Sequence, residues 1–173
     1  MNKTSLTLLV LFLVLIPAQA LVFNNLVLFN VAVPLVFIYM LITLPVTFSA
    51  NLAMTIGFVT GLTVDILADT AGVNALASTI LTFVRRPVFH LYIPVDNDLA
   101  EQRPSLRNMG VAAFLKYAVT MALIYCMTVF LIEGIGCFNL KLLLLRTLSS
   151  TVYTFIMIYA LACLTVGRRE KRL

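Results

Sequence analysis

Charged residues are scarce in this sequence of 173 residues: only 11% are Asp, Glu, Lys or Arg, whereas 62% are hydrophobic. A soluble globular domain needs about 25% charged residues to cover its surface. The shortage, together with a mean hydropathy of +1.07, excludes an ordinary soluble domain. It predicts a single integral membrane domain over residues 1–173.

The residue types that hold metals, build disulfide frameworks or act as nucleophiles are also few. The sequence has no tryptophan, a single histidine (His90) and three scattered cysteines. No serine motif accompanies the histidine, and the cysteine spacing fits neither a metal site nor a disulfide framework. We therefore expect a protein that is not an enzyme and that uses no metal or other cofactor.

Basic residues outnumber acidic ones, 12 against 7, which gives a net charge of +5. They cluster at the ends of apolar runs, and this placement is how a membrane protein fixes its orientation. We therefore expect contact with membrane lipid and no nucleic-acid partner. The arginines expected to mark the cytoplasmic side are Arg85, Arg86, Arg103, Arg107, Arg168 and Arg169.

Turn signals divide the chain into six apolar segments that could cross a bilayer. These segments are about 5–23, 28–45, 50–68, 73–91, 110–132 and 140–166. An even number of crossings puts both termini on one side, and the positive-inside rule places them in the cytoplasm with the polar loop 92–109. The sequence thus predicts an all-α polytopic membrane protein, a six-transmembrane-helix bundle. The second segment contains Pro34 and Pro45, so we expect a kink there.

The first segment allows two interpretations. It ends in Ala18-Gln19-Ala20, which fits the small-x-small cleavage site of a signal peptide. Alternatively, its apolar run of about 18 residues is a retained first span. Retention is favoured because it keeps both termini and the charged loop on one side, but cleavage would also satisfy the downstream charges.

Small and acidic residues recur every four positions in the third segment: Ala53, Gly57, Gly61, Asp65 and Asp69. Four residues advance a helix by about 400°, so these positions form one slanting ridge. The small residues allow a second helix to approach closely in lipid. We expect Ala53, Gly57 and Gly61 to form a packing or partner-binding face, with the second helix supplied by this chain or by another.

An aspartate inside the bilayer needs a partner, because its insertion costs about 2.5–3.5 kcal/mol at the centre. Arg146 lies about 9 Å along the last segment and has the same estimated depth as Asp65. We therefore predict an intramembrane Asp65–Arg146 ion pair. The alternative is two side chains that snorkel independently. Asp69, Glu133 and Lys141 are expected at the outer interface.

Gly57, Gly61 and Asp65, followed by Gly72, Ala75 and Leu76, form the pattern G-x-x-x-G-x-x-x-D and then G-x-x-A-L. This pattern resembles the central signature of the rod shape-determining protein MreD family. Chain length, the number of predicted spans and the basic C-terminal tail extend the resemblance over most of the chain.

The resemblance implies a non-catalytic inner-membrane scaffold of the bacterial cell elongation complex, coupling MreC and MreB to peptidoglycan synthesis and cell shape. MreC is the expected direct partner, and MreB, RodZ, RodA and a penicillin-binding transpeptidase are expected in the same complex. The resemblance also implies a fold similar to the substrate-binding subunits of energy-coupling-factor transporters. The loop 92–109 is then either a docking site for RodZ or the filament, or a solvated connector.

A substrate-binding subunit of a small-molecule (vitamin) transporter is the alternative function. Short spans interrupted by proline or glycine often mark a substrate site, and charges inside the membrane often mark an ion path. Against this function, the segments show no internal repeat, and the first one lacks the A-x-x-x-A coupling motif of those transporter subunits.

Overall fold

The structure, a computed structural model, describes residues 3–23, 33–93, 104–134 and 140–170. Within these ranges the chain forms helices and turns and contains no β-strand, so the all-α prediction is confirmed. In chain order the elements are α1 (Lys3–Ala18), its π-helical continuation η1 (Gln19–Phe23), α2 (Ile38–Ile42), α3 (Ala50–Ala68), α4 (Val73–Tyr92), α5 (Leu106–Met109), α6 (Val111–Glu133) and α7 (Leu140–Glu170).

Three of these helices are long and apolar enough to cross a membrane: α3, α6 and the Leu140–Thr165 part of α7. These helices indicate a membrane protein. The helix α1 contributes a shorter apolar stretch, Val10–Leu21. The helix α4 has sufficient length, but polar residues such as Arg85 and Arg86 interrupt it. Six membrane-spanning helices are therefore not confirmed.

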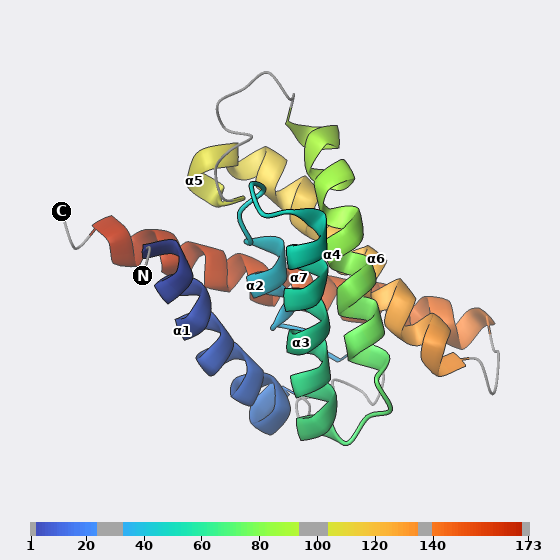
Figure 1. The fold of residues 1–173 in the computed structure, drawn as a ribbon. Helices are drawn as coiled ribbons and strands as arrows, with labels where there is room; N and C mark the ends of the chain where they lie inside the picture. Colours follow the sequence, from blue (N-terminus) through green and yellow to red (C-terminus); the bar gives the residue numbers. More distant parts are fainter. Residues whose placement is uncertain (1–2, 24–32, 94–103, 135–139, 171–173) are drawn as a thin grey trace.

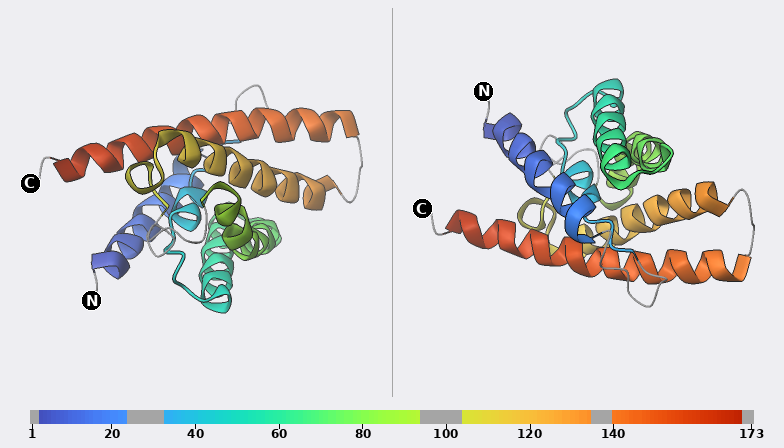
Figure 2. Two further views of the ribbon diagram at one scale, coloured as in Figure 1. Left: turned by 90° about the horizontal axis from the view of Figure 1, so that it is seen from above. Right: turned by 90° about the horizontal axis from the view of Figure 1, so that it is seen from below.

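The helices are arranged as two antiparallel hairpins that cross each other (Figure 1). One hairpin is formed by α3 and α4, and the other by α6 and α7. Figure 2 shows the second hairpin as two long neighbouring helices that run crosswise to the first. The three long apolar helices consequently do not lie parallel to one another in a simple bundle.

Local sequence explains the tight turn of the α3–α4 hairpin. The Ser49 side chain caps the start of α3 by accepting a hydrogen bond from the Leu52 amide. Asp69 ends α3 in the left-handed conformation with φ of 53°, and Gly72 precedes α4 with φ of 79°. Glycine adopts this conformation freely and Asp tolerates it better than most residues. The chain therefore reverses within a few residues.

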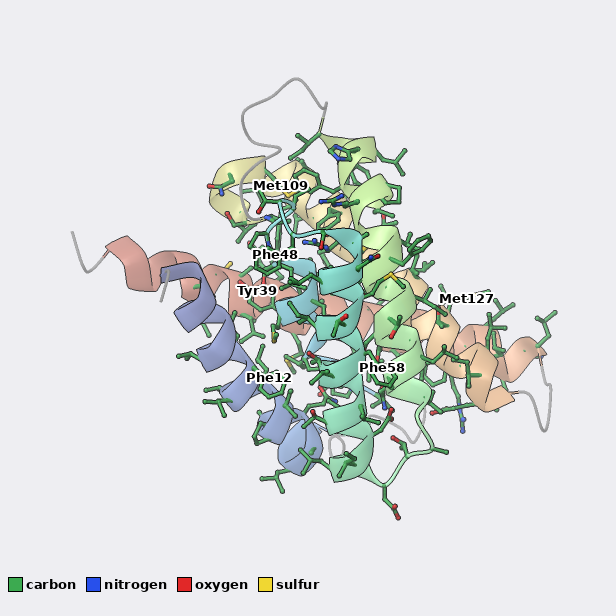
Figure 3. All side chains as sticks on the ribbon, in the orientation of Figure 1. Phe12, Tyr39, Phe48, Phe58, Met109 and Met127 are labelled. Atoms are coloured by element: carbon green, nitrogen blue, oxygen red, sulfur yellow. The ribbon has the colours of Figure 1, made fainter. Side chains whose placement is uncertain are left out.

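The predicted second span is wrong. Residues 33–48, called here the central segment, contain only the five-residue α2, and the part of the prediction at 28–32 lies outside the described residues. Pro45 disfavours helix at Leu44 and so helps to end α2, and Pro34 disfavours helix at Val33, so a helix does not continue through that point. Figure 3 shows Tyr39 and Phe48 of this segment in the middle of the molecule, between α1 and α3.

Residues 34–46 of the central segment are buried although much of their backbone is not helical. Side chains from the first and last helices bind its backbone. Gln19 of η1 accepts a hydrogen bond from the Val36 amide at 2.8 Å and donates one to the Pro34 carbonyl at 2.9 Å. Ser150 and Thr154 of α7 accept hydrogen bonds from the Val33 and Leu35 amides, both at 3.0 Å. Irregular backbone can exist within a membrane protein when protein groups satisfy it in this way.

Candidate functional site

The small residues of α3 form a packing face, but α4 of the same chain occupies it. A Cβ atom added at Gly57 would lie 2.8 Å from the Ser78 carbonyl oxygen, and one added at Gly61 would lie 2.6 Å from the Ala75 Cα. Ala53 continues this face and is only 1% exposed. The glycines therefore bring two helix backbones of one hairpin together, and the interpretation of this ridge as a free partner-binding face is wrong.

Asp65 is the polar centre of the hairpin. It is 2% exposed, and its carboxylate points at the first turn of α4. The Asp65 Oδ1 accepts hydrogen bonds from the Asn74 amide at 3.1 Å, from the Asn74 Nδ2 at 2.9 Å and from the Thr70 hydroxyl. The Oδ2 accepts one from the Ala75 amide at 2.8 Å. An acidic side chain near the N-terminus of a helix satisfies free amides and interacts favourably with the helix dipole.

The predicted Asp65–Arg146 ion pair is wrong, because α4 takes both carboxylate oxygens of Asp65. Within the described part of the chain, neither a hydrogen bond nor an ion pair joins the two residues. Arg146 is half-buried on α7 and interacts electrostatically with Glu133, the last residue of α6. Asp69 and Lys141 are exposed at helix ends, and their location at the outer interface stays a prediction.

A tyrosine links the hairpin to the rest of the fold. The hydroxyl of Tyr125, a fully buried residue of α6, donates a hydrogen bond of 2.8 Å to the Asn74 Oδ1. Since Asn74 also binds Asp65, a continuous polar connection runs from α3 through α4 to α6. The sequence contains a signal for this connection, because Asn74 and Tyr125 are polar residues inside apolar segments. The prediction of an ion pair considered only charged residues and therefore missed them.

Arg85 and Arg86 bind backbone instead of lying free at a membrane surface. Arg85 is 1% exposed; its guanidinium donates to the Leu44 carbonyl and, at 3.0 Å, to the Pro45 carbonyl. Arg86 donates to the carbonyls of Val46 at 3.1 Å and of Phe48 at 2.8 Å. Two neighbouring arginines of α4 thus hold the end of the central segment. The assignment of these two arginines to the cytoplasmic side stays a prediction.

We expect Arg85→Lys to destabilise the fold although the charge is retained. Lysine is a single point of charge and lacks the fork that lets arginine donate to two adjacent carbonyls. The loss of one charged hydrogen bond should lower the free energy of unfolding by about 1.5–3 kcal/mol. Thermal unfolding of the detergent-solubilised protein, followed by far-UV circular dichroism, measures this effect.

Arg146→Lys is the matched control for this substitution. The Arg146 guanidinium has no hydrogen-bond partner in the part of the chain that the structure describes, so this variant should unfold at the wild-type temperature. Equal effects of the two substitutions would show that the carbonyl contacts of Arg85 contribute nothing specific.

A cavity of about 400 Å³ lies beside the turn of the α3–α4 hairpin. Its polar lining comes from several elements, and its charged groups in the described ranges are Glu133 and Arg146. Thr70 and Glu133 are exposed, so the cavity reaches the surface there. Among the described residues, the lining consists of Gln19, Val33, Leu35, Val64, Ala68, Thr70, Asn74, Val129, Phe130, Glu133 and Arg146.

Some of the predicted site residues fall outside what the structure describes. Arg103 and most of the loop 92–109 lie there, and so do the side chains of Arg107, Arg168 and Arg169. In the described ranges, Cys126 and Cys163 are free thiols, and no cluster of three or more His, Cys, Asp or Glu side chains could hold a metal ion.

Comparison of the chain with protein-family models, with curated proteins and with solved structures finds no match.

Proposed function

We propose that this protein is a non-catalytic membrane scaffold subunit of the kind that the MreD resemblance implies, acting in the bacterial inner membrane in a cell elongation complex. The observation that carries the proposal is that the motif residues form one structural unit. Gly57 and Gly61 allow α4 to pack closely against α3, and Gly72 provides the left-handed turn that precedes α4. Asp65 caps α4 by accepting a hydrogen bond from the Ala75 amide, and Ala75 also lies against Gly61. This common role supports the interpretation of these residues as one motif.

Leu76 is the one motif residue that the fold does not use. Its side chain is 51% exposed on α4, and Ile80 and Phe83 continue the same apolar stripe with 37% and 61% exposure. Because α4 itself fills the glycine ridge, a partner helix such as the single span of MreC has to bind elsewhere. We assign this stripe, which is adjacent to the motif, as the face that binds the partner helix.

Leu76→Ser together with Phe83→Ser should reduce recovery of an MreC-type single-span partner by about tenfold in affinity purification from detergent extracts. A tenfold loss corresponds to about 1.4 kcal/mol, or about 0.7 kcal/mol of helix packing for each of the two apolar side chains. Circular dichroism should show unchanged thermal unfolding, because both side chains are exposed.

A matched pair of variants on α7, Leu148→Ser with Val152→Ser, serves as the control, since these residues are similarly exposed at 58% and 59%. A similar loss in both pairs would assign the effect to general membrane insertion. Absence of any single-span partner in the wild-type purification would contradict the scaffold function itself.

The cavity favours the second candidate, a substrate-binding subunit of a vitamin transporter. Its volume lies at the lower end of the range of about 300–1,000 Å³ that is usual for ligand sites. Uptake of radiolabelled vitamins into cells that express the protein separates the two functions. A scaffold gives no uptake above background, whereas a transporter subunit gives uptake that saturates.

A further inference from the structure

Two charged side chains that line the cavity, Glu133 and Arg146, can bind a ligand. The other polar groups of its lining are bound internally: Gln19 holds the central segment, and Thr70 and Asn74 bind Asp65. The guanidinium of Arg146 and the carboxylate of Glu133 have no hydrogen-bond partner among the residues that the structure describes, although the two charges interact. Of the residues described, a ligand entering the cavity therefore meets the cation of Arg146 and the anion of Glu133.

The cavity lies close to the ends of several helices, and Arg146 lies about 9 Å from the start of α7. Glu133 is the last residue of α6, Ala68 is the last of α3, and Asn74 is in the first turn of α4. Charged side chains at the ends of apolar helices lie close to the lipid head groups. The wall below them is apolar and comes largely from the candidate membrane spans, through Val64, Val129 and Phe130.

We propose that this cavity binds the head group of a zwitterionic phospholipid that carries a primary ammonium. Arg146 binds the phosphate, because a guanidinium matches the geometry of phosphate oxygens. Glu133 binds the ammonium. The apolar wall accepts the first part of the acyl chains. This assignment is independent of the scaffold function proposed above.

Native mass spectrometry of the full chain in detergent tests the proposal, by titration with phosphatidylethanolamine and with phosphatidylglycerol of identical acyl chains. The wild type should bind phosphatidylethanolamine more tightly. Arg146→Gln should weaken this binding about tenfold or more, since it removes a charged hydrogen bond. Glu133→Gln should reverse the preference toward phosphatidylglycerol, because the remaining guanidinium favours a net anionic head group.

Lys141→Gln is the matched control: Lys141 is an exposed residue of α7 outside the cavity lining, and its substitution should change neither affinity. The reversal in Glu133→Gln keeps the test valid even if Arg146→Gln folds poorly. Equal affinities for both lipids, unaltered by Glu133→Gln, would overturn the proposal. Glycerophosphoethanolamine has the same head group without acyl chains. If it bound as tightly as the lipid, the proposal would also be overturned, because the ligand would then be a soluble zwitterion.

Discussion

Asp65→Ala should lower the free energy of unfolding by about 3–5 kcal/mol, because it leaves buried amides at the start of α4 without acceptors. The amides of Asn74 and Ala75 lose their charged acceptor, and Thr70 and the Asn74 side chain lose theirs. For a chain of this size we expect a drop of roughly 10 °C in the thermal midpoint. Circular dichroism of the detergent-solubilised protein measures it.

Asp69→Asn is the control for this variant. Asp69 is exposed, and Asn also accepts the left-handed conformation that this position requires, so stability should remain at the wild-type level. A double-mutant cycle between Asp65→Asn and Arg146→Gln should show additive effects. A coupling energy above about 1 kcal/mol would be evidence for a direct Asp65–Arg146 ion pair and would contradict the hydrogen-bonding geometry of Asp65.

Gly61→Ala should have a comparable effect through steric overlap, lowering the free energy of unfolding by about 3 kcal/mol or more. The new methyl group would overlap the backbone of α4 at Asn74 and Ala75, and Asp65 holds this backbone in place. The helices cannot separate without breaking that cap. We expect a loss of monodisperse protein in size-exclusion chromatography and a lower thermal midpoint in the fraction that folds.

Gly134→Ala provides the comparison, because a Cβ atom there would lie at an ordinary distance of 3.6 Å from the Leu143 side chain. This variant should be as stable as the wild type. Gly57→Ala should fall between the two, since the Thr82 side chain is one of its obstacles and can change rotamer. A stable, monodisperse Gly61→Ala protein would show that the close approach of α3 and α4 is not required.

The sequence alone predicted well where the long helices lie. The segments 50–68, 73–91, 110–132 and 140–166 differ by a few residues at most from α3, α4, α6 and α7. Long apolar runs between turn residues produce a strong pattern, which explains this success. The spacing of Gly57 and Gly61 also correctly indicated close helix packing.

The partners of individual residues were much harder to predict. Equal estimated depth suggested Arg146 for Asp65, but depth along a helix does not determine which helices are neighbours. The donors around Asp65 come from a turn of a few residues, which brings Asn74 and Ala75 to the carboxylate. In the same way, the apolar run that contains Pro34 and Pro45 predicted a membrane-spanning helix. The backbone there is largely non-helical, because side chains far away in the sequence, such as Ser150 and Thr154, accept hydrogen bonds from its amides.

The dependence of the central segment on distant residues has a consequence for biogenesis. The Val33 amide binds Ser150, which lies 117 residues further along the chain, and the Leu35 amide binds Thr154, 119 residues away. The ribosome must therefore synthesise most of the protein before these amides can find their final acceptors. We therefore expect the backbone around Val33 and Leu35 to reach its native contacts late, after α7 has been synthesised.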